Sequence, residues 1–119
     1  MGSGIGQAAS SQEGEAKELA VVRLVVLTPR AQDDVVAIAA YTLEQWGDAQ
    51  MVRYVDDLHR RFGQLGQFPE TGRRRPDIGR RYRSVVQGSH VIFYRVTAKE
   101  VVIVRVLHGR MSAARHLPK

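Results

Sequence analysis

The chain has 119 residues, a length that supports one hydrophobic core but not two. It contains no cysteine, which excludes disulfides, thiol nucleophiles and cysteine-ligated zinc. Lysine and arginine number 18 against 12 aspartates and glutamates, for a net charge of +6. No apolar run approaches the roughly 18–20 residues of a membrane span, and the first residues lack the pattern of a signal peptide. We therefore expect a cytoplasmic protein with no membrane partner.

The positive charge lies outside the first residues. Residues 1–22 hold Lys17 against three glutamates, so the remainder of the chain has a net charge of +8. All but three of the cations are arginines. This charge predicts an acidic partner, which can be a nucleic acid, a nucleic-acid enzyme or an acidic peptide.

Residues 1–20 differ in composition from the rest of the chain. Glycine, serine, alanine and glutamine dominate as far as Ser11, which is typical of a flexible segment. We interpret residues 1–20 as a flexible leader, a tag or a fused segment, with a native acidic arm as the alternative. Residues 21–119 are interpreted as the folded domain.

The first strand and the first helix adjoin each other. Residues 21–27 are rich in valine and leucine and predict a strand. Thr28 is a good helix N-cap and Pro29 a good first helical residue, so we expect a helix over residues 29–46. Apolar side chains recur along it at helical spacing, and Trp46 at its end is assigned to the core.

A second helix follows after a tight turn. Gly47 suits the left-handed conformation that ends helices, and Asp48 is expected to cap the next helix, over residues 49–67. The turn is so short that the two helices are expected to form an antiparallel αα-hairpin.

A basic loop and three strands complete the chain. The loop arginines are Arg73, Arg74, Arg75, Arg80 and Arg81. Residues 81–86 alternate in the manner of a strand. Residues 90–96 and 101–107 are rich in β-branched and aromatic residues and predict a hairpin around a four-residue turn. The apolar run at 101–104 needs cover on both faces, which predicts a central strand.

The expected order of elements is therefore β-α-α-β-β-β. The last three strands would form an antiparallel meander, with the first strand at an edge or beside the last. We predict an α+β, two-layer domain in which the αα-hairpin packs on an antiparallel sheet, followed by a short basic C-terminal tail.

Four segments stand in order along residues 22–117. They are LTPRAQDDVVAIAAYTLEQWGDAQ at 27–50, FPETGR at 68–73, GSHVIFYRV at 88–96 and VLHGRMSAARHL at 106–117. In this order and spacing they resemble the ParE-like toxins of the ParE/RelE superfamily, which belong to type II toxin–antitoxin pairs. The domain at 21–119 is thus expected to be a ParE/RelE-like toxin domain.

The resemblance implies a function that fold alone does not decide. ParE-like toxins inhibit DNA gyrase by binding, and a cognate antitoxin neutralises them by wrapping an acidic segment around the toxin in a hetero-oligomer. RelE-like members instead cleave messenger RNA on the ribosome. A third alternative is an inactive member that only binds an antitoxin.

The chemistry of the side chains favours binding over catalysis. Metal-free RNA cleavage needs a base, an acid and cationic support, for which the candidates are Arg83, Arg105 and His108, with His116 as a further acid or base. The tail has no tyrosine, and the only lysine between Arg23 and Pro118 is Lys99. We therefore predict no catalytic residues and a binding surface for gyrase or another partner, made of Arg83, Arg105, His108, Arg110, Arg115 and His116.

Other ligands have weak support in the sequence. No histidines or carboxylates stand at ligand spacing, and there is no glycine-rich phosphate loop, so we expect no metal and no cofactor. The arginine loop has two interpretations, contact with nucleic acid or a solvated loop. Because no aromatic residues alternate with its arginines, we do not expect direct binding to nucleic acid.

Overall fold

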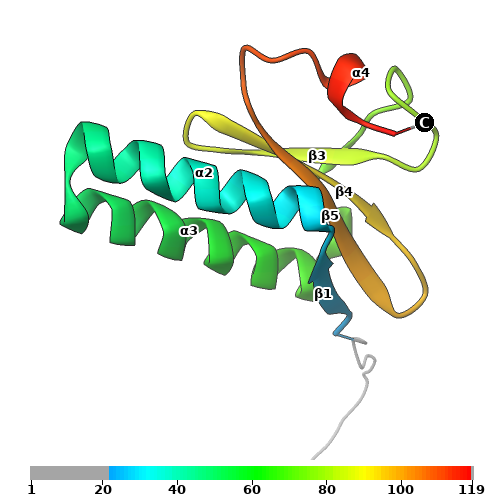
Figure 1. Ribbon diagram of the computed structural model, residues 1–119. Coiled ribbons are helices and arrows are strands. Elements are labelled where there is room, and N and C mark those ends of the chain that lie inside the picture. The colour runs from blue at the N-terminus through cyan, green and yellow to red at the C-terminus, as the bar shows by residue number, and fades with distance from the viewer. Residues whose placement is uncertain (1–21, 119) are drawn as a thin grey trace, which may run out of the picture.

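The computed structural model describes residues 22–118. Two long helices lie side by side and pack against one face of a five-stranded sheet (Figure 1). The elements are β1 (Leu24–Leu27), α2 (Pro29–Trp46), α3 (Asp48–Gln67), β2 (Arg73–Arg74), β3 (Arg83–Gln87), β4 (His90–Val96), β5 (Glu100–His108) and α4 (Ala113–His116). The expected leader, residues 1–20, lies outside the described residues. The α+β prediction and the αα-hairpin are confirmed.

The strands are ordered β1-β5-β4-β3-β2 across the sheet. The pairs β2–β3, β3–β4 and β4–β5 are antiparallel, as the predicted meander requires. The first strand lies beside the last, but β1 runs parallel to β5, so the sheet is mixed and not wholly antiparallel. β5 therefore lies between two neighbours, which confirms it as a central strand.

The sequence prediction missed strand β2. Arg73 and Arg74 pair with Ser84 and Arg83 at the edge of the sheet, where the interpretation as a loop had placed no strand. Both side chains of β2 are exposed, so no apolar alternation marks the strand in the sequence. A two-residue, charged edge strand is a common way to protect a sheet from further pairing.

Backbone hydrogen bonds outside the sheet set the beginnings of two strands. The first strand begins at Leu24, two residues after the start of the described chain, and the Arg23 amide before it donates to the Gly66 carbonyl of α3 (2.9 Å). Residue 21, where the strand was expected to begin, lies outside the described residues. A Cβ on Gly66 would lie 2.8 Å from the Arg23 carbonyl oxygen, so this close contact requires glycine. The second predicted strand, expected over residues 81–86, begins at Arg83, since the Tyr82 amide closes a turn onto Gly79.

The ends of the helices follow the local signals closely. The Thr28 hydroxyl accepts from the Ala31 amide (3.1 Å) and donates to the Val104 carbonyl (2.8 Å), so it both caps α2 and joins it to β5. Gly47 has φ +89° at the helix junction, where a side chain would be strained. Asp48 does not act as the cap, because Gly47 occupies that position and Asp48 is the first residue of α3.

Two hydrophobic clusters cover the two faces of the sheet. On the helix side, Leu58, Phe62 and Leu65 of α3 pack against Ile92, Tyr94 and Ile103. On the other side, Tyr82, Phe93, Val104 and Leu107 pack with Leu117 of the tail. The tail and the segment before β3 thus close the second face, and the sheet remains the centre of the fold.

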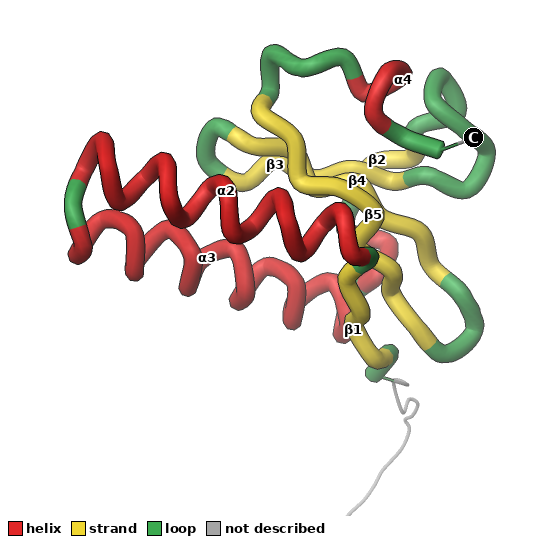
Figure 2. Tube along the Cα trace, in the orientation of Figure 1, coloured by secondary structure: helices red, strands yellow, loops and turns green. Residues whose placement is uncertain are grey.

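The assignment of Trp46 to the core is wrong. Its side chain is 71% exposed. Figure 2 shows the reason, because the helix junction extends beyond the end of the sheet and has no layer to pack against. None of the described helices is long and apolar enough to cross a membrane.

Candidate functional site

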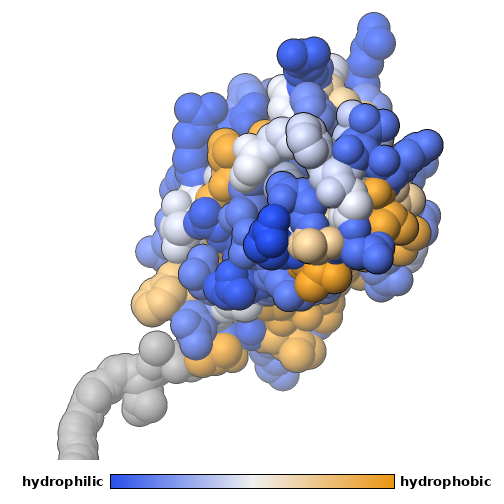
Figure 3. All heavy atoms as spheres, turned by 90° about the vertical axis from the view of Figure 1, so that its left-hand side faces the viewer, coloured by the Kyte–Doolittle hydropathy of each residue, from blue (hydrophilic) through white to orange (hydrophobic). Residues whose placement is uncertain are grey.

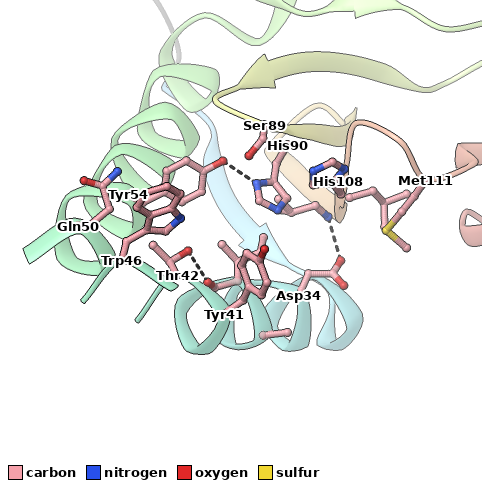
Figure 4. Close-up of a pocket in the computed structure, with 14 residues that line it drawn as sticks. Asp34, Tyr41, Thr42, Trp46, Gln50, Tyr54, Ser89, His90, His108 and Met111 are labelled. Carbon is pink, nitrogen blue, oxygen red and sulfur yellow. Dashed lines mark hydrogen bonds between the residues drawn. The ribbon is translucent and has the colours of Figure 1, made fainter. Parts of the chain in front are cut away.

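A groove of about 670 Å³ lies between α2, the start of α3 and the adjoining ends of β4 and β5. The segment after β5 forms its outer wall through Met111 (Figure 4). The groove is partly open to solvent, so a segment of a partner protein can enter it from the surface.

Large side chains line this groove without being buried. Trp46 is 71% exposed, Tyr41 62% and Met111 43%. Viewed from the helix junction, hydrophobic side chains gather in patches among hydrophilic ones (Figure 3). Aromatic residues and methionine are the types enriched at protein–protein interfaces, so this groove has the composition of a docking surface.

The polar part of the groove is an ordered row of three side chains. Tyr54 on α3 donates to the Gln87 carbonyl (2.9 Å), and its oxygen lies 2.6 Å from His90 Nδ1. The hydroxyl has one proton, which Gln87 receives, so Nδ1–H of neutral His90 is the donor to Tyr54. His108 packs edge-on against His90, with ring centroids 5.6 Å apart.

The two histidine rings offer complementary hydrogen-bonding atoms. With Nδ1 of His90 protonated, its Nε2 is an acceptor. Nδ1 of His108 accepts from the Arg110 amide (3.1 Å), which leaves Nε2–H of His108 as a donor. Burial lowers the pKa of His90, the neighbouring His108 lowers it further, and Asp34 partly opposes both effects. His90 is therefore held neutral, and the two rings can bond to a main-chain amide or a polar side chain.

One ion pair fixes the tail beside the groove. Asp34 on α2 accepts from Nε (2.7 Å) and Nη2 (2.8 Å) of Arg105, and also from the Val106 amide (2.9 Å). The hydrogen bond and charge of Asp34 raise the pKa of Arg105, against the effect of burial. Nη1 of Arg105 donates to the His116 carbonyl (3.1 Å), so α2, β5 and the tail are joined through one guanidinium.

Residues 25–113 match the family model described as "ParE toxin of type II toxin-antitoxin system, parDE". This match covers most of the chain. The chain belongs to the ParE toxin family.

Curated ParE relatives agree with this assignment. The chain is 37% identical over 93 residues to Toxin ParE1 of Mycobacterium tuberculosis (strain ATCC 25618 / H37Rv), covering 77% of this chain and 95% of the relative. It is 36% identical over 91 residues to Toxin ParE1 of Caulobacter vibrioides, covering 76% and 94%. Nearly the whole length of each relative is thus represented here.

A solved structure has the same fold. The chain superposes with a TM-score of 0.64 on a chain from the chromosomal ParDE TA system of P. aeruginosa, at 22% identity. The alignment covers 73% of this chain and 96% of the other. The α+β fold, with an αα-hairpin packed on a sheet, is therefore shared with a chain of a solved ParDE system.

The predicted binding residues of this ParE chain lie in separate places. His108 lines the groove, and Arg110 and Arg115 are exposed on the tail next to it. His116 is half-buried, with Nδ1 2.7 Å from the Ser112 carbonyl oxygen. Arg105 is only 8% exposed and is bound to Asp34, so it cannot contribute to a surface. Its place in the structure is that of a support for the tail.

The three candidates for RNA cleavage do not converge. Arg83 lies opposite Tyr94 of β4, whereas His108 lies opposite His90. Four residues along a strand span about 13 Å, and Arg105 is bound to Asp34. Nη1 of Arg83 donates to the Gly72 carbonyl (2.7 Å), directly before the edge strand β2. This geometry does not support a common phosphate between the three side chains.

The sequence did not identify most residues of the groove, among them Asp34, Tyr54, His90 and Trp46. Tyr54 and His90 are 36 positions apart in the chain, so no spacing rule connects them. Trp46 carried a usable signal, because it stands at the last position of a helix directly before a glycine, where packing partners are few. Among residues 22–118, no group of three or more histidines, aspartates or glutamates is arranged to hold a metal ion.

Proposed function

We propose that this ParE chain acts by binding and not by catalysis. In the proposal, the groove takes a segment of a cognate antitoxin, and the free chain inhibits DNA gyrase. The observation that carries the proposal is the groove itself, where Trp46 and Tyr41 are exposed beside an ordered polar row. Such exposed aromatic residues are typical anchors for a protein partner. Family membership and the ParDE origin of the structural neighbour support an antitoxin as that partner.

The shape and charge around the groove indicate which kind of antitoxin segment would bind there. Its long wall is helix α2, and its exposed apolar residues repeat along that helix, so an amphipathic segment can align with it. Outside residues 1–22 the chain has a net charge of +8, which favours an acidic segment and speeds its encounter with the toxin. The proposed occupant is an acidic amphipathic stretch of the antitoxin.

The exposed tail is the part that we assign to gyrase. Arg110 and Arg115 are exposed there, and His108 adjoins them at the edge of the groove. Met111, next to Arg110, forms the outer wall of the groove. A segment lying in the groove would therefore contact the same stretch of chain and hinder access to the tail. This arrangement gives a physical route from antitoxin binding to neutralisation.

Two reactions with the purified chain test the proposed activity. The chain is added to a gyrase supercoiling reaction with relaxed plasmid and ATP, and separately to coupled transcription and translation. We expect cleaved plasmid to accumulate in the first reaction while translation continues in the second. Cleavage of ribosome-bound messenger RNA with unaffected gyrase would instead establish the RelE-like alternative and overturn the proposal.

A binding experiment tests the antitoxin. The chain is co-expressed with the protein encoded next to its gene, which we expect to be the acidic antitoxin, and purified in low salt, where charge attraction is strongest. We expect a stable complex in which the chain no longer affects gyrase. If the two proteins separate in low salt, the proposed use of the groove is wrong. If neither gyrase nor translation responds while the complex forms, the chain is an inactive family member.

A further inference from the structure

A second hollow, of about 270 Å³, lies at the opposite edge of the sheet from β1. Four arginines from β2, β3 and the segment between them surround it, namely Arg74, Arg80, Arg81 and Arg83. Tyr82 and Val96 complete the lining, so this arginine hollow shares no residue with the groove. The function proposed for the groove therefore does not account for this cluster of arginines.

Positive charge in the arginine hollow is not balanced by the described part of the chain. Within residues 22–118 the ion pairs are Arg60–Asp57, Arg75–Asp77 and Arg105–Asp34. None of them includes an arginine of the hollow. The carboxylate nearest in sequence, Asp77, is bound by both Nε (3.0 Å) and Nη2 (2.9 Å) of Arg75. Four like charges around one hollow raise the local potential and favour an anion there.

The arginines of the hollow are carried by an ordered scaffold. Successive turns connect the segment, with the amides of Ile78 and Gly79 both donating to the Arg75 carbonyl. The Tyr82 hydroxyl donates to the Pro118 carbonyl, which fixes the segment to the tail. Nη1 of Arg83 donates to the Gly72 carbonyl (2.7 Å), which orients that guanidinium on β3. The backbone that carries the arginines is thus ordered and one of the four guanidinium groups is already oriented, which lowers the entropy lost on binding.

A neighbouring arginine strengthens the field of the hollow. Arg95 of β4 lies over the Tyr82 ring, 5.9 Å from its centroid. Its Nε is buried and has no hydrogen-bond partner among the described residues. This buried donor adds a fifth positive charge next to the ring that lines the hollow.

We propose that the arginine hollow binds the phosphodiester backbone of nucleic acid. Guanidinium groups match phosphate oxygens through paired hydrogen bonds, and several arginines in one place match a repeating anion. The Tyr82 ring is only 4% exposed, so it offers no platform on which a base could stack. The hollow therefore contacts phosphates and not bases, and it binds with little sequence preference. This function lies beyond the proposed contacts with antitoxin and gyrase. It replaces the expectation from the sequence that the arginine loop does not bind nucleic acid, because that expectation considered base stacking, which phosphate contacts do not need.

The experiment measures fluorescence anisotropy of labelled nucleic acids with the full chain across a series of salt concentrations. The probes are duplex DNA of two unrelated sequences, single-stranded DNA and RNA of equal length. We expect similar affinity for the two duplexes and a steep loss of binding with salt. The comparison of probes shows which form of the backbone fits the hollow best.

The test variant is the double substitution R80Q/R81Q, and the control is R53Q/R60Q. All four positions are exposed, and both variants lose the same charge. R53Q/R60Q removes its two charges from α3, away from the hollow. Each phosphate contact contributes about 0.9 to the slope of log K against log salt, so R80Q/R81Q should lower that slope by about 2. Its affinity at low salt should fall by at least about tenfold, while the control stays within about twofold.

Three results would overturn the proposal. The first is that the unchanged chain shows no salt-dependent binding of nucleic acid. The second is that both variants lose the same affinity for nucleic acid. The third is that a polyglutamate peptide binds more tightly than any nucleic acid and that its affinity depends on Arg80 and Arg81 to the same degree. Thermal unfolding of both variants checks that the fold is intact. Because the groove is separate, R80Q/R81Q should still co-purify with the antitoxin, so failure of this inference is distinguishable from failure of the proposed function.

Discussion

Asp34 on α2 binds both Nε and Nη2 of Arg105 on β5, although the two residues are 71 positions apart in the chain. The side chains are 13% and 10% exposed, so the pair is largely withdrawn from water. A buried pair of charges is costly to desolvate, and it is tolerated here because each member has further hydrogen bonds. Asp34 also accepts from the Val106 amide, and Arg105 donates to the His116 carbonyl. The pair thus connects the helix layer, the sheet and the tail.

Replacing Asp34 by asparagine should destabilise the fold strongly. The substitution leaves the Arg105 guanidinium buried without its counter-charge, a situation that costs about 3 kcal/mol or more. Asp33, the preceding residue, is exposed and serves as the matched control. D33N should change the free energy of unfolding by no more than about 0.5 kcal/mol. Urea unfolding followed by circular dichroism measures both, and equal stability of the two variants would show that the pair contributes little.

Local signals in the sequence predicted the helices well. Thr28 and Pro29 placed the start of α2 at the residue where the structure begins it, and Gly47 marked its end. These signals work because caps and turns depend on neighbouring residues only. The hydrophobic runs of β4 and β5 were equally clear, since a strand covered on both faces needs continuous apolar residues.

Apart from the cap expected at Asp48 and the local turn before β3, the features that failed depend on the arrangement of distant parts of the chain. Arg105 was expected at a surface, but its burial follows from Asp34, which spacing cannot reveal. Trp46 was expected in the core, but its exposure follows from the length of the helices relative to the sheet. The edge strand β2 has only arginines, so its pairing with β3 leaves no pattern in its own residues. The groove between the helices and the sheet could not be predicted from sequence either, because its residues come from distant parts of the chain.

The stability of the fold should depend on pH through His90. Burial lowers the pKa of folded His90, and His108 adds to this effect, so the unfolded chain takes up the proton more readily. Stability is then complete above the ordinary histidine pKa of about 6.5 and falls as the pH decreases towards the lower folded value. Urea unfolding at a series of pH values between about 7 and 5 measures this slope.

A substitution of His90 distinguishes its contribution to the pH dependence of stability from that of other titrating groups. H90Q should flatten the decline of stability over that range, because the proton uptake of the unfolded chain is lost. H59Q is the control, since His59 is exposed on α3. A decline that stays as steep in H90Q as in H59Q would assign the pH dependence to another group.

The Tyr94 hydroxyl should contribute to stability at the end of α3. Tyr94 is fully buried, donates to the Pro69 carbonyl (2.7 Å) and accepts from the Gly72 amide (2.8 Å). Y94F leaves both backbone groups without this partner, which costs about 1–3 kcal/mol. Y41F removes a hydroxyl from a tyrosine that is exposed, and should be close to neutral. Thermal unfolding compares the two, and a neutral Y94F would mean that water replaces the lost hydroxyl.

Trp46 should be the main anchor of the proposed antitoxin segment. It is the largest exposed side chain lining the groove, and tryptophan is the residue type most enriched among anchors that cost 2 kcal/mol or more on truncation. W46A should therefore weaken the complex by about 30-fold or more while leaving the stability of the free chain nearly unchanged. Isothermal titration calorimetry with the purified antitoxin measures the affinity.

The matched control for W46A is F68A. Phe68 is an aromatic residue that is 64% exposed, but it lies at the end of α3 and does not line the groove. F68A removes a similar amount of exposed apolar surface, so its affinity should remain within about twofold of the unchanged chain. Equal affinities for W46A and F68A would mean that the antitoxin binds elsewhere. Trp46 is exposed because α2 extends beyond the sheet. If the antitoxin binds elsewhere, this exposed tryptophan has no proposed binding partner.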